Sequence, residues 1–249
     1  MDIKTNFTYI WIALGIITFF YLLKFKTAPY GRHTSKNWGP MIDNKLGWIL
    51  MESPALILFL FFALQGFPAF SNPVIVFIAL WCIHYFNRTF IFPFRTKTKG
   101  KKMPLIIALS AIGFNSINTW LIGTFINGNA LNYSNEWFTT PQFIIGLFVF
   151  LIGFFMNQSA DNTLLNLRKP GETDYKIPQG KLFKYISSPN LIGEIIEWIG
   201  FFIMTWHLAT FTFALWTIAN LAPRIVSHHK WYLEKFENYP KERKAFCFF

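Results

Sequence analysis

The chain has 249 residues, of which 53% are hydrophobic and 20% aromatic, and this composition is typical of an integral membrane protein. Its formal net charge of +11 does not indicate nucleic-acid binding, because every basic cluster flanks an apolar stretch and the charge bias of membrane proteins explains it. Cys82 and Cys247 lie far apart without the spacing of a zinc site, so we expect neither a metal site nor a disulfide framework.

Apolar stretches long enough to cross a hydrocarbon core of roughly 30 Å recur along the chain. Five of them are predicted as single spans: Thr8 to Leu23, Leu46 to Leu64, Val74 to Phe92, Leu105 to Ile126 and Phe143 to Met156. The next tract, Leu191 to Leu221, is ambiguous. As one helix it would reach roughly 46 Å at 1.5 Å per residue, which is too long for one span.

The basic residues resolve this ambiguity, because Lys and Arg gather on cytoplasmic loops. They follow the first, third and fifth spans and close the chain, whereas residues 65–72 and 127–140 carry neither Lys nor Arg. The tract from Leu191 to Leu221 must therefore cross an even number of times, as a hairpin that turns near Thr205 to Leu208. We predict an all-α protein of seven transmembrane helices, with its N-terminus outside and its C-terminus in the cytoplasm.

Ionisable residues inside the second and third spans are candidates for function, because such groups are costly at membrane depth. Glu52 precedes Pro54, which can disturb the helix, and it is either a neutral hydrogen-bonded carboxyl or a proton donor to a ligand carbonyl. Tyr85 is either a packing residue or a hydroxyl donor. Arg88 can extend toward the cytoplasmic surface from the same helix.

The second half of the chain carries further polar residues. Glu194 and Glu197 stand three residues apart, so one polar pocket can receive both carboxylates, and Asn157 and Asp161 share a helix face at the end of the fifth span. Basic and aromatic residues beside Gly and Pro turns suit an anionic ligand, although a solvated cytoplasmic loop has the same composition. The relevant candidates in this loop and just past the last span are Arg168, Tyr175, Arg224, His228, His229 and Tyr232. The last four either close a cofactor pocket or, for the His228-His229 pair, form a solvated helix end.

Several nucleotide and catalytic motifs are absent from the sequence. It contains no G-x-G-x-x-G after a strand, no Walker motif, no H-E-x-x-H motif and no Ser-His-Asp arrangement. The polar residues must therefore form the site themselves. We expect one intramembrane cavity with a basic cytoplasmic mouth, lined by Glu52, Tyr85, Asn157, Asp161, Glu194 and Glu197.

Seven separated strings of residues resemble the steroid 5-alpha-reductases, the membrane-embedded 3-oxo-5-alpha-steroid 4-dehydrogenases. They agree in order and spacing, and they are Tyr30 to Thr34, Glu52 to Pro54, His84 to Phe90, Arg168 to Glu172, Tyr175 to Gly180, Gly193 to Gly200 and Tyr232 to Lys244. Asn87 stands where many relatives have His, and Arg32 where some have Lys, so neither position receives a role.

The resemblance implies a single membrane-embedded domain over residues 1–249 that uses NADPH, bound mainly by residues 143–249, to reduce the C4-C5 double bond of a 3-oxo-4-ene steroid. Glu52 and Tyr85 would be catalytic, because two donors on the C3 carbonyl stabilise the enolate that forms as hydride reaches C5. The residues expected to hold NADPH are Asn157, Asp161, Arg168, Tyr175, Asn190, Glu194, Arg224, His228 and Tyr232.

Other functions remain open at this point. Membrane polyprenol and enoyl-CoA reductases share the cofactor and the chemistry, an isoprenylcysteine-type methyltransferase would bind S-adenosylmethionine, and a steroid carrier would catalyse nothing. The expected partners are a steroid and membrane lipid, without nucleic acid or an obligatory protein partner, so we expect a monomer. The composition suits either a bacterial inner membrane or the endoplasmic reticulum membrane.

Overall fold

The computed structural model describes residues 3–25, 38–66, 70–97, 100–129, 131–169, 172 and 174–246. The matched string from Tyr30 to Thr34, with Arg32, and also Cys247 lie outside this part of the chain. The chain forms two compact units: one comprises Met1–Ala28 with Ile145–Phe249, and the other comprises Pro29–Ile144.

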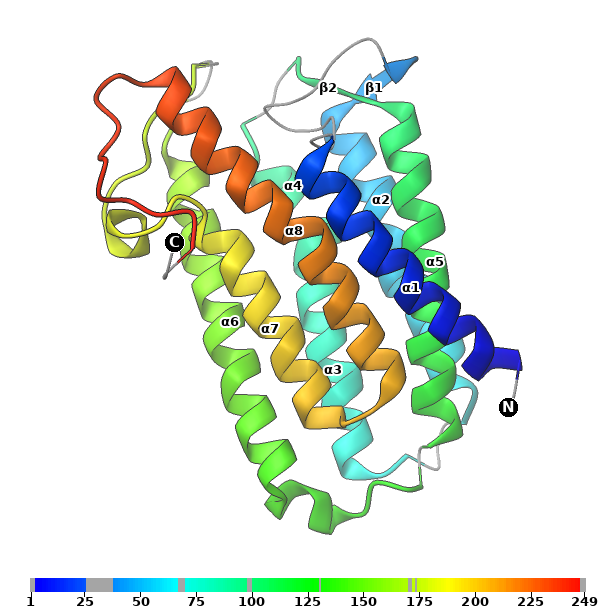
Figure 1. Cartoon of the computed structure of the whole chain (residues 1–249). Helices are drawn as coiled ribbons and strands as arrows, with labels where there is room; N and C mark the ends of the chain where they lie inside the picture. The colour runs from blue at the N-terminus through cyan, green and yellow to red at the C-terminus, as the bar shows by residue number, and fades with distance from the viewer. Residues whose placement is uncertain are drawn as a thin grey trace. The chain divides into compact units, whose positions relative to one another are not determined.

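The unit from Pro29 to Ile144 is built around helices α2 and α5, which pack against each other (Figure 1). Its elements in chain order are β1 (Met41–Asp43), α2 (Asn44–Ala63), η3 (Leu64–Gly66), α3 (Asn72–Phe86), η4 (Asn87–Ile91), α4 (Phe92–Arg95), β2 (Lys102–Pro104), α5 (Leu105–Gly128) and η5 (Asn135–Thr139). β1 and β2 pair antiparallel, with Met41 opposite Pro104. This small ribbon joins the starts of α2 and α5, since each helix begins at the residue after its strand.

The other unit carries α1 (Ile3–Lys24), most of α6 (Pro141–Asn166), η6 (Lys181–Lys184), α7 (Pro189–Thr205) and α8 (Leu208–Lys235). α8 packs against both α7 and α1, and Figure 1 shows α1 running along α8. The indole of Trp216 on α8 fixes this contact, because its Nε1 donates to the Trp11 carbonyl at 3.0 Å and its ring lies 4.6 Å from that of Trp11.

Within the described part of the chain, five helical segments are long and apolar enough to cross a membrane, which indicates a multi-pass membrane protein. They are Ile3–Lys24, Asn44–Ala63, Asn72–Arg95, Leu105–Gly128 and Pro141–Asn166, and each contains most or all of one of the five single spans predicted from the sequence. The fifth is longer than predicted, because the helix continues through the polar turn that holds Asn157 and Asp161.

The ambiguous tract forms two helices that meet at Trp206 and His207, within the turn predicted from the charge pattern. Trp206 ends α7 in a left-handed conformation, with φ of 48°. His207 caps α8, since its Nδ1 accepts the backbone N–H of Ala209 at 3.1 Å. Burial, with a smaller contribution from the positive charge of Lys4, lowers the pKa of His207 to about 4, so its ring stays neutral and can accept this bond.

Helices α6 and α7 approach each other through glycines. A Cβ added to Gly153 would lie 2.2 Å from the backbone nitrogen of Glu197, and one added to Gly200 would lie 2.2 Å from that of Phe150. A Cβ added to Gly146 would lie 2.2 Å from the backbone nitrogen of Met204, and one added to Gly193 would lie 2.6 Å from that of Asn157. Small residues allow this backbone contact between membrane helices. These four glycines form an antiparallel contact that we term the glycine seam.

The glycine seam generates a stability prediction. Gly153→Ala places a methyl group against the backbone of α7, where no flexible side chain can move aside, so we expect a loss of about 3 kcal/mol or more, at the upper end of overpacking costs. Gly113→Ala is the matched control, because a Cβ on this α5 residue meets nothing within 4 Å. Thermal unfolding in detergent should show a lower melting temperature for Gly153→Ala only, and equal melting temperatures for both variants would contradict the seam.

Candidate functional site

The glycine seam leads into a polar network between α6 and α7. Asn157, which is 1% exposed, donates from Nδ2 to the backbone carbonyl of Asn190 at 3.0 Å and to Oε2 of Glu194 at 3.4 Å. Asn190 in turn donates from Nδ2 to Oδ1 of Asp161 at 3.1 Å. Four residues singled out from the sequence therefore lie together, and the amides of two of them hold the carboxylates of the other two.

The two glutamates of α7 differ in their surroundings. Glu197 is fully buried, and its backbone packs against Gly153 in the glycine seam. Glu194 lies one turn nearer the start of α7, is half-buried and contacts Asn157. Glu194 is thus associated with the polar network.

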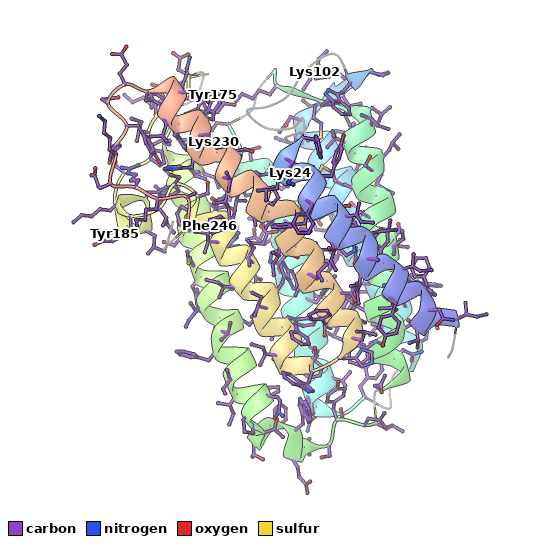
Figure 2. The ribbon with its side chains drawn as sticks, viewed as in Figure 1. Lys24, Lys102, Tyr175, Tyr185, Lys230 and Phe246 are labelled. Atoms are coloured by element: carbon purple, nitrogen blue, oxygen red, sulfur yellow. The ribbon has the colours of Figure 1, made fainter. Side chains whose placement is uncertain are left out.

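A second group of predicted residues lies at the C-terminal end of α8. The guanidinium of Arg168 stands over the ring of Tyr175 at 4.6 Å, and Tyr175 contacts Trp231 edge to face at 4.9 Å. Trp231 neighbours Tyr232, which is buried. Figure 2 shows Tyr175 beside the end of α8 that carries Lys230. The loop after α6 is therefore attached to α8 by the Tyr175–Trp231 ring contact, and the cation–π contact of Arg168 with Tyr175 lies within the loop.

The same loop carries an ion pair. Glu172 accepts hydrogen bonds from the Lys176 ammonium and, at 2.9 Å, from the backbone N–H of Lys169. The hydrogen bond from Lys176, followed by that from Lys169, holds the pKa of Glu172 below its ordinary value. This exposed pair restricts the loop locally but contributes little to global stability.

Arg224, His228 and Tyr232 lie within α8, which continues to Lys235. They were expected just past the last span, but the helix extends well beyond the apolar tract that ends at Leu221. Their spacing of four residues puts all three on one face of the helix. Nδ1 of His228 lies 3.3 Å from Oγ of Ser188, the residue immediately before α7.

Arg243 is a residue that the sequence analysis did not single out. Its side chain is 3% exposed and donates from Nη1 to the Pro178 carbonyl at 2.9 Å and from Nη2 to Oε1 of Gln179 at 2.8 Å. Its guanidinium also lies over the ring of Tyr239, 5.3 Å away. Two of the matched strings, Tyr175 to Gly180 and Tyr232 to Lys244, thus contact each other, and their joint presence was the only signal of this contact in the sequence.

In the other unit, Trp81 sets the register between α2 and α3. Its Nε1 donates to the Ala55 carbonyl at 2.8 Å, and its ring stacks on that of Phe59 at 4.8 Å. The guanidinium of Arg88 lies 5.3 Å from the ring of Trp48. Trp81 on α3 contacts Ala55 in the middle of α2, whereas Arg88, just past the end of α3, contacts Trp48 near the start of α2. The two helices therefore run antiparallel.

This register brings Glu52 and Tyr85 to the same level. Glu52 lies about one turn before Ala55 on α2, and Tyr85 lies about one turn after Trp81 on α3, so both are displaced in the same direction from the Trp81–Ala55 hydrogen bond. The Tyr85 ring, which is 6% exposed, packs against Trp81 with ring centroids 4.8 Å apart. Glu52 is half-buried. Glu52 and Tyr85, two potential hydrogen-bond donors, therefore lie at the same level along the α2–α3 helix pair.

The helix containing Tyr85 changes its winding immediately afterwards. Residues Asn87–Ile91 form a π-helical turn, η4, between α3 and α4. Such turns are rare and frequently occur at functional sites. Arg88 lies in this turn, and its guanidinium also contacts the ring of Phe92 at 4.8 Å. The cation is therefore placed against aromatic rings one turn beyond Tyr85.

Comparison with known proteins gives consistent matches. A family model described as 3-oxo-5-alpha-steroid 4-dehydrogenase matches residues 101–249. The chain is 41% identical to "Steroid 5-alpha-reductase DET2" of Gossypium hirsutum, with 97% of this chain and 96% of the relative covered. It is 40% identical to "3-oxo-5-alpha-steroid 4-dehydrogenase 1" of Bos taurus, covering 95% and 92%, and 39% identical to "3-oxo-5-alpha-steroid 4-dehydrogenase 2" of Rattus norvegicus, covering 88% and 87%.

Proposed function

Because the chain belongs to the 3-oxo-5-alpha-steroid 4-dehydrogenase family, we propose that it uses NADPH to reduce the C4-C5 double bond of 3-oxo-4-ene steroids to 5-alpha-3-oxosteroids. The observation that carries this proposal is the common level of Glu52 and Tyr85, set by the Trp81–Ala55 hydrogen bond. This common level supports the proposal that the two side chains donate hydrogen bonds to one carbonyl oxygen from two different helices.

Glu52 and Tyr85 act on the C3 carbonyl of the substrate. Two hydrogen bonds to this oxygen draw electron density out of the conjugated enone and make C5 electrophilic. They strengthen as the oxygen gains negative charge, so they stabilise the enolate more than the ground state. Glu52 donates only in its protonated form. The aromatic packing around Tyr85 keeps its hydroxyl in a fixed position.

The residues of α6, α7, α8 and the loop after α6 fit a dinucleotide phosphate. Glu194 can accept the N–H groups of the nicotinamide carboxamide, and Asn157, Asp161 and Asn190 hold Glu194 and the first turn of α7 in place. Arg168, Tyr175, Arg224, His228 and Tyr232 supply the cations and rings that phosphates and adenine prefer. NADPH, when bound, supplies the hydride.

The membrane topology belongs to the same proposal. We infer that α7 and α8 also cross the bilayer as a hairpin, which gives seven spans with the N-terminus outside and the C-terminus in the cytoplasm. The clean alternation of basic and non-basic loops supports this topology. It leaves the basic residues of the loop after α6 and of the end of α8 on the cytoplasmic side, where NADPH is available. The steroid then enters from the lipid phase, and a monomer suffices.

Removing either carbonyl donor should slow turnover. Glu52→Ala removes a donor and should lower kcat on a 3-oxo-4-ene steroid by a factor of about 10² or more. Glu52→Gln keeps an amide donor and should lower kcat less. Tyr85→Phe deletes only a hydroxyl and should lower kcat with little change in melting temperature. Tyr21→Phe is the control, because Tyr21 is half-exposed on α1. Steady-state product formation measures all four, and wild-type rates in Glu52→Ala would exclude the carbonyl role.

Glu194 should determine cofactor binding. Glu194→Gln places an amide where an acceptor is needed, so NADPH should bind at least about tenfold more weakly, which corresponds to about 1.4 kcal/mol. Glu197→Gln, at the buried glycine seam, should lower the melting temperature with a smaller effect on affinity.

Ligand-dependent thermal shift measures cofactor binding and stability together. The wild type should be stabilised by NADPH more than by NADH. Stabilisation by S-adenosylmethionine instead would favour a methyltransferase, and stabilisation by a steroid alone would favour a carrier. Unchanged NADPH binding in a destabilised Glu194→Gln protein would contradict the assignment of Glu194.

A further inference from the structure

Two adjacent serines pair with two adjacent histidines at the start of α7. Oγ of Ser187 lies 2.6 Å from Nδ1 of His229, and Oγ of Ser188 lies 3.3 Å from Nδ1 of His228. Both serines are 2% exposed and immediately precede α7, whereas both histidines stand on α8. The histidine pair is therefore attached to the beginning of α7 and is not merely a solvated helix end.

Ser187 is the centre of a larger set of contacts. Its Oγ also lies 2.7 Å from the hydroxyl of Tyr239, which is 4% exposed, and 3.3 Å from the Lys244 carbonyl. Its backbone N–H donates to the same carbonyl at 3.0 Å, and the Lys244 N–H donates to the Tyr185 carbonyl at 3.0 Å. Ile186 and Lys244 form an isolated parallel bridge. The segment after α8 is thus bound to the segment before α7.

The hydrogen atoms of this network can be assigned consistently. The Ser187 hydroxyl donates to the Lys244 carbonyl, and its Oγ accepts from the Tyr239 hydroxyl and from the Nδ1–H of His229. The Tyr239 ring itself is held by two neighbours, since it stacks on Tyr232 at 5.1 Å and receives the Arg243 guanidinium at 5.3 Å. The hydroxyl of Tyr239 therefore reaches Ser187 from a ring that has little freedom to move.

The residues that follow Ser187 and Ser188 in the sequence belong to the polar network of α6 and α7. Pro189 starts α7 two residues after Ser187, and the next residue, Asn190, contacts Asn157 and Asp161. On α8, His229 adjoins His228, one of the residues proposed to hold the cofactor. A displacement at Ser187 would hence be transmitted both to the first turn of α7 and to His228.

We propose that Ser187, His229 and Tyr239 are positioning residues for the cofactor site: they hold the first turn of α7, with Asn190 and Glu194, against the end of α8 that carries His228. This inference rests on the proposed use of NADPH. None of the three needs to contact NADPH or the steroid, because they act through the residues that do. Their contribution is to fix the geometry of the site before the cofactor arrives, which reduces the entropy lost on binding.

The test deletes single hydroxyl groups and measures NADPH affinity directly. Tyr239→Phe keeps the ring with its contacts to Tyr232 and Arg243, and Ser187→Ala removes the central oxygen. Tyr239→Phe should raise the NADPH dissociation constant, measured by calorimetry, about tenfold, as expected for one lost buried hydrogen bond, and Ser187→Ala should raise it at least as much, because it also removes the bonds to His229 and Lys244. The value of kcat at saturating NADPH and the KM for the steroid should change less than about twofold. Hydrogen exchange without cofactor should become faster at the amides of Ser187 and Lys244.

Two further proteins make the test specific. Tyr185→Phe is the matched control, because Tyr185 lies two residues before Ser187 but its side chain is 61% exposed. It should bind NADPH as the wild type does. The double variant Ser187→Ala/Tyr239→Phe should lose no more affinity than Ser187→Ala alone, since both single changes break the same hydrogen bond.

The outcomes are distinguishable. A lower melting temperature with unchanged NADPH affinity in Ser187→Ala and Tyr239→Phe would overturn the positioning role and leave only a structural one. Additive losses in the double variant would overturn the shared network. A wild-type protein without affinity for NADPH would instead overturn the proposed function, from which the inference starts.

Discussion

The half of the chain that carries the proposed cofactor residues depends on backbone contact between α6 and α7. Gly146, Gly153, Gly193 and Gly200 leave no side chain between the two helices, so the backbones touch along the glycine seam. The close backbone contact fixes the register of α6 against α7. Beyond the seam, Asn157 hydrogen-bonds Asn190 and Glu194, and Asp161 accepts a hydrogen bond from Asn190. A larger residue at any of the four glycines would separate amides and carboxylates that now lie within hydrogen-bond distance.

In the unit from Pro29 to Ile144, a side chain and not a backbone contact fixes the register of two helices. A single indole, that of Trp81, hydrogen-bonds the backbone of α2, stacks on Phe59 and contacts the tilted ring of Tyr85. Glu52 and Tyr85 are thereby brought to one level, and they come from two different helices. Rigid helices are better supports for such groups than loops, because catalysis by hydrogen-bond donors requires them to be preorganised.

The sequence predicts the helices well because apolar length and the placement of Lys and Arg are strong signals. Even the turn between α7 and α8 follows from charge alone, without a Gly or Pro to mark it. The extension of α8 to Lys235 was missed, because its last turns are polar and hydropathy does not distinguish them from a loop. The ribbon of β1 and β2 and the π-helical turn at Asn87–Ile91 leave no signal in periodicity.

For the site, residue types at helical spacing identify Asn157, Asp161 and Glu194, since polar groups in apolar helices are conspicuous. Ser187, Tyr239 and Arg243 were not identified, because they lie in polar segments where such residues are ordinary. Their importance depends on contacts between the segment after α8 and the loop before α7, more than 50 residues apart in sequence, as between Ser187 and Tyr239. A long-range contact of this kind cannot be derived from local pattern.

The central claim is that this protein reduces a conjugated steroid at the expense of NADPH. The most direct measurement is product analysis by mass spectrometry and NMR after incubating the purified protein, in lipid, with NADPH and a 3-oxo-4-ene steroid. The account predicts a product heavier by two hydrogen atoms, with hydrogen in the alpha configuration at C5 and an intact C3 carbonyl, formed in equal amount to the NADPH oxidised. An unchanged steroid, or a product reduced at C3 with the double bond retained, would contradict it.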